Sequence, residues 1–470
     1  MRADPLKEDA PLERALSTTD AVLVTLGATL GTGIFLTTSE IARAVPDPRG
    51  ILILWAGGGL LALAGALTYA ELGAMFPKVG GQYRYLKEAY GPLFGFLYGW
   101  GSFFVMMTGG IAVLAVGFGE YLGAFLPYFS SAHRLWTIPL GPIAWTATGA
   151  QLAGAIAIAG LTAINYTGVR AGTRFQNAIT AAKVGSLVLL GVVGIFLPAR
   201  VGAFPHTGSL FPTGFAAAGV GMIAVLWTYD GWYGATFLAG EMRRPEKSLP
   251  VGLIAGTSAV TGIYLLVNIV YVRALPVSKL STTPRVAEAA ALALFGPGGG
   301  RLITTLVLVS IFGCLATTVL YCARIYLPMS RDGLFFAAFG RIHPTHHTPG
   351  ASLLAQGAWG IALAFSGTYE QLYTYVTFAI FLFHAVTGIA VIVLRRRRPD
   401  QPRPFRTPGY PWIPLAFVAV CLVFVGNTLR EKPVESLIGL GILLAGLPAY
   451  LWWRREAVGE ARVSQANRRL

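Results

Sequence analysis

Long apolar stretches recur along the whole chain and restrict the environment in which it can fold. A stretch of about 18 or more apolar residues is long enough to cross a bilayer as a helix, and such stretches return many times in this sequence. Charged residues make up only 12% of the chain, whereas about 25% is usual in a soluble domain. These features predict an all-α integral membrane protein.

The apolar stretches predict twelve transmembrane helices. They lie at residues 20–45, 50–76, 92–127, 146–168, 174–198, 215–240, 250–275, 301–328, 350–367, 371–394, 411–428 and 434–453. Cytoplasmic loops are enriched in Lys and Arg, and the loops and tails on the side of both termini hold 24 of these residues, against 10 in the other loops. We therefore expect both termini in the cytoplasm. The net charge of +15 belongs to these short loops, so it indicates a membrane surface and no nucleic-acid partner.

Three glycines interrupt the first predicted helix between Gly27 and Phe35. Glycine is about 1 kcal/mol less favourable than alanine in a helix, and broken backbone at membrane depth is tolerated only inside protein or along a cavity. A second half-helix beginning near Gly33 would point unpaired N–H groups at that cavity, which suits a carboxylate. The alternative is that the glycines only allow close helix packing. The hydroxyl of Thr32 inside the run, and a second break further on, favour the cavity.

The second break lies in the sixth predicted helix, around Asp230 and the glycines that follow it at positions 231 and 234. An ionisable side chain in the middle of an apolar span is costly and is a functional candidate by default. Two interrupted helices in corresponding positions are typical of transporters built from inverted repeats, with the ligand near the membrane midplane. We therefore expect a first five-helix repeat at residues 20–200 and a second at 215–394. Residues 1–19 would form the N-terminal tail, and 395–470 the last two helices and the C-terminal tail.

Other polar residues inside the apolar spans have more than one interpretation. Lys183 needs a carbonyl or carboxylate partner, beside the first break, unless it extends to the membrane surface. Tyr264 and Asn268 share one helix face, where either an interhelical hydrogen bond or a role at the ligand is possible. Trp227 could cover the cavity or simply pack. His384 is interpreted first as a hydrogen-bonded interior histidine and second as a proton relay.

Several functions are disfavoured by the sequence. Its three cysteines, at 314, 322 and 421, all lie in apolar spans and form no disulfide or metal pattern. The histidines at 343, 346 and 347 lie in a proline-containing loop without nearby Cys or carboxylate. Glu71 and Glu120, near the ends of two spans, are expected to face the membrane interface. Neither a P-loop nor a hydrolase motif is present, so we expect no enzyme, no metal site and no cofactor.

At the level of motifs, the sequence resembles the amino acid, polyamine and organocation superfamily, and within it the L-type amino-acid transporter group and its bacterial relatives. The resemblance extends over roughly residues 17–453. The matching stretches are Gly31–Phe35, Glu71–Pro77, Gly80–Tyr83, Trp227–Trp232, Gly240–Glu241 with Pro245, Arg331–Gly333 and Arg403–Pro411. It implies a fold of five plus five inverted-repeat helices with two further helices, broken helices 1 and 6, and amino-acid transport by alternating access.

The resemblance also implies roles for particular residues. The backbone of Thr32, Gly33 and Ile34 would bind the α-carboxylate of the substrate. Carbonyl groups at Trp227, Thr228 and Asp230 would bind its α-amino group. The side chain would lie between spans one, three, six, eight and ten.

Three further positions match functional residues of the family. Trp227 corresponds to an aromatic gate, and Tyr264 to a tyrosine that helps to close the inner side. Lys183 replaces the sodium site of sodium-coupled relatives, which implies sodium independence. Animal members use a cysteine between spans three and four to join a heavy chain, and residues 128–145 contain none. We therefore expect a bacterial-type protein of the inner membrane without a disulfide-linked heavy chain.

The resulting hypothesis is a sodium-independent amino-acid transporter that works as an exchanger or facilitator. The alternative is a proton-coupled transporter of amino acids or polyamines, although polyamines would need several cavity carboxylates and Asp230 is the clear one. A membrane receptor that senses amino acids is a hypothesis from a different class. Such receptors usually carry a signalling domain, for which the 19 residues before the first span and the 17 after the last are too short.

Overall fold

The computed structural model describes residue 14 and residues 16–140, 143–167, 172–198, 209–346 and 348–454, and most of them are helical. The predicted tails and His347 therefore lie largely outside the described residues. The first half contains α1 (Thr18–Thr29), α2 (Gly33–Leu36), α3 (Thr38–Ala44), α4 (Pro48–Met75), α5 (Gln82–Tyr90), α6 (Pro92–Gly101), the π-helical turn η1 (Ser102–Met106), α7 (Met107–Leu122), the 3₁₀ turn η2 (Pro127–Phe129), α8 (Gly149–Thr167) and α9 (Gly172–Phe196). The second half contains α10 (Gly214–Tyr229), the 3₁₀ helix η3 (Gly234–Glu241), α11 (Pro245–Ala274), α12 (Val277–Leu280), α13 (Val286–Arg331), the 3₁₀ turn η4 (Ala337–Gly340), α14 (Gly350–Ala364), α15 (Tyr369–Arg397), α16 (Trp412–Glu431) and α17 (Pro433–Leu444).

Nine helical stretches of the described residues are long and apolar enough to cross a membrane. A tenth apolar helix, α14, is shorter. The two remaining predicted spans, 20–45 and 215–240, are divided among shorter helices, α1 to α3 in the first case and α10 with η3 in the second. The number of long spans among the described residues is therefore nine rather than twelve, because two of the apolar stretches are not continuous helices and α14 is short.

The first interruption follows the glycine pattern closely. Ser17 and Asp20 form a capping box that starts α1, since each side chain hydrogen-bonds a backbone N–H that the helix leaves free. The helix ends at Thr29, and α2 begins at Gly33. The intervening residues, Leu30 to Thr32, are buried. Helical hydrogen bonding therefore stops inside the protein, away from its surface.

The second interruption follows α10. This helix ends at Tyr229, and the next four residues form turns before the 3₁₀ helix η3. Gly231 has a φ of 100°, a conformation that residues with a Cβ rarely adopt. The chain therefore changes direction at the Asp-Gly pair.

Two features differ from the sequence-based expectation. The segment between α7 and α8 contains an antiparallel pair of strands, β1 (Arg134–Leu140) and β2 (Ile143–Thr148), so the protein is predominantly but not purely α-helical. The strands are rich in Trp, Thr and Ile, which favour β structure, and a Gly-Pro dipeptide separates them in sequence. The second difference is that α13 begins before the predicted span at 301–328 and bends at Gly296, which has a φ of 74° and precedes a proline.

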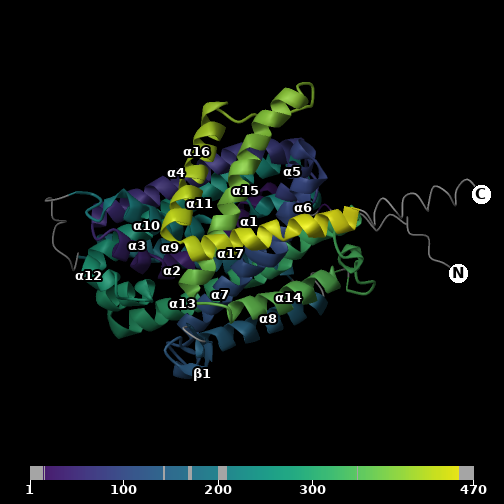
Figure 1. The fold of residues 1–470 in the computed structure, drawn as a ribbon. Helices are drawn as coiled ribbons and strands as arrows, with labels where there is room; N and C mark the ends of the chain where they lie inside the picture. Colours follow the sequence, from purple (N-terminus) through teal and green to yellow (C-terminus); the bar gives the residue numbers. More distant parts are fainter. Residues whose placement is uncertain are drawn as a thin grey trace, which may run out of the picture.

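The helices pack into one bundle (Figure 1). Along one edge α8 lies beside α14, with the strand pair at the end of α8. In the interior, α11 packs against α1 and α4. A Cβ atom added to Gly252 of α11 would lie 2.8 Å from the Cβ of Ala21, and one added to Gly256 would lie 2.6 Å from the Cβ of Thr25. These glycines are four residues apart, the spacing of small residues that brings membrane helices close together.

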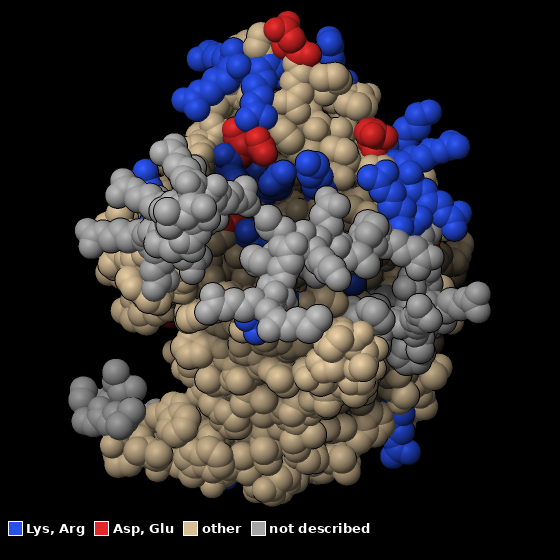
Figure 2. Space-filling model, turned by 90° about the vertical axis from the view of Figure 1, so that its right-hand side faces the viewer, with Lys and Arg blue, Asp and Glu red and all other residues tan. Residues whose placement is uncertain are grey.

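Charged side chains are unevenly distributed over the surface. In the view of Figure 2, Lys and Arg gather in the upper part of the molecule, whereas the lower part is almost entirely made of uncharged residues. Apolar side chains on the outside include Leu60, Ile156, Leu189 and Val423, each more than half exposed. The exposed apolar side chains fit a surface that contacts lipid, and the basic region fits a loop-rich face at a membrane surface.

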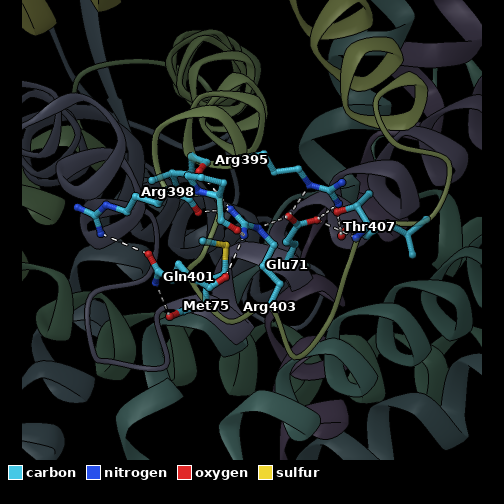
Figure 3. Close-up of polar contacts among 10 residues, drawn as sticks. Glu71, Met75, Arg395, Arg398, Gln401, Arg403 and Thr407 are labelled. Carbon is cyan, nitrogen blue, oxygen red and sulfur yellow. Dashed lines mark hydrogen bonds and ion pairs between the residues drawn. The ribbon is translucent and has the colours of Figure 1, made fainter.

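Glu71 at the end of α4 forms a buried polar centre (Figure 3). Its side chain has no exposed surface, so it does not face the membrane interface as predicted but points into the protein. Arg395 of α15 donates to both of its carboxylate oxygens, at 2.8 and 2.7 Å, and the backbone N–H of Thr407 donates at 2.8 Å. Arg403 lies 3.5 Å away and donates to the carbonyl of Leu394 near the end of α15. Glu71 therefore fastens the segment after α15 to the end of α4.

We expect Glu71→Gln to destabilise the protein by about 3–5 kcal/mol, because removal of one partner leaves a buried arginine without its counter-charge. The measurement is the free energy of unfolding in mixed micelles. Glu88→Gln is the matched control, since Glu88 pairs with the more exposed Arg398 and exposed pairs contribute about 0–1 kcal/mol. Equal losses in the two variants would contradict the role assigned to Glu71.

Candidate functional site

The two interruptions lie against each other with no space between them. A Cβ atom on Gly33 would lie 2.2 Å from Oγ1 of Thr228, and one on Gly231 would lie 2.6 Å from the carbonyl oxygen of Ala28. Both distances are far shorter than any real Cβ contact. The glycines are therefore needed for the two broken helices to meet.

A small pocket opens beside this contact. Four parts of the fold line it: the first interruption, the second interruption, the η1–α7 region and α13. Its lining residues are Ala28, Thr29, Gly31, Thr32, Gly33, Met106, Met107, Gly110, Leu114, Trp227, Thr228, Asp230, Gly231, Thr318 and Tyr321. The site is thus mainly apolar with a few polar groups.

Asp230 supplies the carboxylate among the residues that line this cavity. Its Oδ2 atom accepts a long hydrogen bond of 3.5 Å from the hydroxyl of Tyr233. Its Oδ1 atom is buried, and among the described residues it has no hydrogen-bond partner. The Nε2 atom of His384 lies 3.9 Å from Oδ1. A buried carboxylate oxygen without a hydrogen bond raises the free energy of the folded protein. A donor on a ligand that reached Oδ1 would remove this cost.

Trp227 and Thr32 are joined by a tyrosine that sequence analysis missed. The hydroxyl of Tyr369, at the start of α15, lies 2.9 Å from Oγ1 of Thr32 and accepts from Nε1 of Trp227 at 3.2 Å. The ring of Tyr373 stacks on Trp227 with centroids 6.3 Å apart. A capping box between Thr368 and its third following residue marks this helix start, but no sequence signal shows that it lies beside the two interruptions.

Tyr264 of α11 connects the ends of the two interrupted helices. Its hydroxyl is within hydrogen-bond distance of the carbonyl oxygens of Thr29 (2.8 Å) and Thr228 (3.0 Å). Asn268, one turn further, accepts a hydrogen bond from the hydroxyl of Thr38 in α3 at 2.8 Å. Both side chains are fully buried. The pair therefore makes contacts between helices, and Tyr264 does so behind the cavity rather than in its wall.

Lys183 of α9 is buried and does not extend to the surface. Its ammonium group donates to the carbonyl oxygens of Gly27 (2.6 Å) and Leu30 (3.2 Å), at the end of α1. These carbonyls lose helical partners where α1 stops. Lys183 therefore supplies hydrogen-bond donors to carbonyl groups at the broken end of α1.

The structure brings together five of the predicted site residues in the cavity wall: Thr32, Gly33, Trp227, Thr228 and Asp230. Ile34 is fully buried in α2 and does not line the cavity. Lys183 and Tyr264 contact the interruptions from behind. No group of three or more metal-binding side chains is found among the described residues.

Four wall residues, Met106, Met107, Thr318 and Tyr321, carry no sequence motif and were missed. Met106 is the last residue of the π-helical turn η1 and Met107 is the first of α7, and the turn shifts the register of the helix at this point. Such turns are frequent at functional sites, but they cannot be found from an apolar sequence. Of the five spans expected around a substrate side chain, the tenth contributes nothing to the described wall and instead contacts Trp227 from behind through Tyr369 and Tyr373.

A second set of contacts lies where η3 ends. Arg324 of α13 donates to Glu241 at 2.6 Å, with both side chains largely buried. The backbone of Leu16 is paired with the same segment, since its N–H donates to the carbonyl of Glu241 at 2.9 Å and its carbonyl accepts from Arg243 at 3.0 Å. These contacts tie the residues before α1, the residues after η3, and α13 together.

The comparisons with known proteins identify the family. Residues 16–432 match the family described as amino acid permease. The chain belongs to this family. The predicted membership of the amino acid, polyamine and organocation superfamily, with likeness to the L-type group, is thereby confirmed. The protein is a multi-pass membrane transporter and not an enzyme.

The relatives of this permease carry names that describe exchange or transport of amino acids. It is 31% identical over 452 residues to the serine/threonine exchanger SteT of Bacillus subtilis (strain 168), which covers 96% of this chain and 99% of that protein. It is 28% identical over 455 residues to human b(0,+)-type amino acid transporter 1, with coverages of 96% and 90%. It is 28% identical over 448 residues to the human cystine/glutamate transporter, with coverages of 95% and 86%. These similarities support amino-acid transport.

We expect Gly33→Ala to destabilise the permease by about 1–3 kcal/mol, because the added methyl group overpacks the contact with Thr228. Gly262→Ala is the matched control. It lies inside α11, where a Cβ atom would meet no neighbour within 4 Å, so it should be neutral or slightly stabilising. Thermal unfolding in detergent measures both, and a stable Gly33→Ala protein would show that the interruptions are not in tight contact.

Proposed function

We propose that this permease is a sodium-independent amino-acid transporter that works as an exchanger or facilitator by alternating access. The observation that carries the proposal is the cavity at the contact between the two interruptions. Interrupted helices can move as separate halves, and a ligand that bridges them has different contacts when either half moves. The names of the relatives support amino acids as the substrate class.

The proposed binding mode uses backbone groups on both sides of the cavity. The α-carboxylate binds the N–H groups of Thr32 and Gly33, which line the cavity, because the first N–H groups of a helix lack helical acceptors and α2 begins at Gly33. The third N–H of the predicted set, that of Ile34, comes within reach only when α2 moves. The α-amino group binds carbonyls of Trp227 and Thr228, together with Asp230. Support comes from the end of α10 at Tyr229, since the last carbonyls of a helix also lack helical partners.

We further propose how the fold is arranged in the inner membrane. Twelve spans form two inverted repeats, at 20–200 and 215–394, followed by two helices at 395–470, with both termini cytoplasmic. In this arrangement, Trp227 with Tyr369 is the gate on one side of the cavity. Tyr264, and the ion pair of Arg324 with Glu241, lie toward the opposite side.

Sodium independence is proposed from the contacts of Lys183. In its absence, the oxygens of Gly27 and Leu30 would form a polar site at the end of α1, where hard cations prefer to bind. The lysine already supplies one positive charge to both oxygens. A transporter without a disulfide-linked partner is proposed as well, since Cys314, Cys322 and Cys421 are buried and residues 128–145 contain no cysteine.

A proton-coupled transporter is the second candidate, and one observation favours it. The Oδ1 atom of Asp230 faces His384 without a hydrogen-bond partner among the described residues, so a proton could be bound between them.

The decisive experiment is uptake of labelled amino acids into proteoliposomes that contain the purified protein, without sodium and at matched pH. Uptake that depends on unlabelled amino acid inside the vesicles supports exchange, and uptake into empty vesicles at equal pH supports a facilitator. Uptake into empty vesicles that requires an acidic exterior would support proton symport instead. A protein that transports no amino acid under any of these conditions would refute the proposed function.

We expect Lys183→Ala to lower sodium-free uptake about tenfold or more, because two buried carbonyl oxygens lose their donor, at a cost of about 1–3 kcal/mol each. Sodium, but not choline, should restore part of the uptake, since the vacated oxygens can bind a small cation. Lys279→Ala, at an exposed lysine, is the control and should transport normally. Undiminished sodium-free uptake by Lys183→Ala would contradict the role of Lys183.

A further inference from the structure

A chain of buried hydrogen bonds leads away from Asp230 into the helices behind the cavity. His384 of α15 stands next to the aspartate, with its Nε2 atom 3.9 Å from Oδ1. Its Nδ1 atom lies 2.7 Å from the hydroxyl of Tyr69 in α4. The Nε2 amide of Gln82 in α5 lies 2.5 Å from that hydroxyl and 2.9 Å from Oγ1 of Thr387. All of these side chains except Asp230 are almost completely buried.

The direction of each hydrogen bond in this chain can be derived from its far end. The hydroxyl of Thr387 donates its one hydrogen to the carbonyl of Phe383 at 2.8 Å, so its oxygen can only accept from Gln82. The amide of Gln82 has two hydrogens, and the second is donated to the oxygen of Tyr69. The hydroxyl hydrogen of Tyr69 is then available for Nδ1 of His384. The bonds from Gln82 to Tyr69 and from Tyr69 to His384 therefore both point toward the cavity.

This direction determines the form of the imidazole. A ring nitrogen that accepts a hydrogen bond carries no hydrogen, so neutral His384 has its hydrogen on Nε2. That N–H faces Oδ1 of Asp230, and among the described residues neither atom has another hydrogen-bond partner. A second proton would have to bind at Nδ1, where it would oppose the O–H of Tyr69. The hydroxyl cannot simply turn away, because its oxygen already accepts from Gln82.

The surroundings of His384 contain no group that would stabilise a charged imidazole other than Asp230. The residues that face its ring are Asp230, Trp232 and Tyr233 at the second interruption, Tyr69 of α4, Phe381 of α15 and Phe417 of α16. The titratable members are one aspartate and two tyrosines. No Lys or Arg of the described residues contacts the ring in an ion pair or stacking interaction. Burial itself disfavours a charged imidazole here, and the hydrogen-bond chain adds to this by occupying Nδ1.

We propose that Tyr69 and Gln82 are positioning residues for His384, which they hold in the neutral Nε2–H form with that N–H directed at Oδ1 of Asp230. The cavity carboxylate thereby receives a hydrogen-bond donor from α15 but not a proton. The 3.9 Å gap closes to a hydrogen bond when Asp230 moves by about 1 Å. Asp230 belongs to the turn segment next to Gly231, whereas His384 lies within a long helix. His384 consequently offers Asp230 a hydrogen-bond donor at a fixed position on α15.

The first test measures the imidazole directly and does not depend on transport. Full-length protein with ¹³C,¹⁵N-labelled histidine is reconstituted in lipid, and the His384 signals are assigned by their loss in His384→Gln. Solid-state NMR should show hydrogen on Nε2 and none on Nδ1, without titration between about pH 5 and 8, the range in which free histidine titrates. A hydrogen on Nδ1, or a titration of His384 in the unmodified protein, would overturn the proposal.

Variants of the chain make the test specific. Tyr69→Phe removes the hydroxyl that blocks Nδ1, so His384 should begin to titrate in the same pH range. Gln82→Leu removes the hydrogen bond to the oxygen of Tyr69, so the hydroxyl can turn and accept a hydrogen bond from Nδ1 of His384. It should have the same effect and provides a second variant if Tyr69→Phe does not fold. Tyr271→Phe is the matched control, since its buried hydroxyl has no hydrogen-bond partner among the described residues. Failure of both chain variants to introduce a titration would contradict the positioning role.

A second readout rests on the proposed function. In Tyr69→Phe, a protonated His384 pairs with Asp230 at acidic pH and withdraws it from the substrate amino group. The KM for amino-acid uptake should therefore rise several-fold between about pH 7.5 and 5.5 in Tyr69→Phe, but not in the unmodified protein or Tyr271→Phe. Identical pH profiles of KM in Tyr69→Phe and Tyr271→Phe would contradict the proposal. A protein without any amino-acid uptake would refute the proposed function, while the NMR result would still decide the form of His384.

Discussion

Backbone groups that leave a helix inside the membrane must find new partners, and this requirement organises the centre of the permease. The carbonyls at the end of α1 are contacted by side chains from three neighbouring helices. Lys183 of α9 donates to two of them, Tyr264 of α11 to a third, and Cys314 of α13 approaches a fourth, that of Ala28, at 3.6 Å. The bundle around the first interruption can therefore be understood as a set of donors for one broken helix end.

Close contact between the interruptions is the second condition. Because Gly33 meets Thr228 and Gly231 meets Ala28 without space for a side chain, the free backbone groups of both breaks reach the same cavity. Tyr264 spans the two ends with one hydroxyl group. A movement of either half-helix would have to break or exchange these contacts. The centre is thus both tightly packed and divided into parts that can separate.

The sequence was informative where a signal is local and limited where it depends on tertiary contacts. Glycines and an aspartate inside apolar stretches locate both interruptions, and five predicted residues line the cavity, because only broken backbone tolerates them there. By contrast, the burial of Glu71 was not predicted. Its partner Arg395 lies 324 residues further along the chain, so no local pattern links the two. Tyr369 and Met106 were missed because an ordinary helix start and an apolar π turn become part of the site only through packing.

The charges around the cavity are arranged in opposition. Lys183 donates to the carbonyl end of α1, and in the proposed binding mode the N–H groups that begin α2 face an anion. At the second interruption, Asp230 adds a carboxylate to the carbonyl end of α10, which favours a cation. In the proposed binding mode, a zwitterion fits between the two, whatever its side chain. In that mode, recognition of the side chain falls to the η1–α7 and α13 walls. Met107 and Tyr321 line these walls, away from the backbone groups that bind the zwitterion.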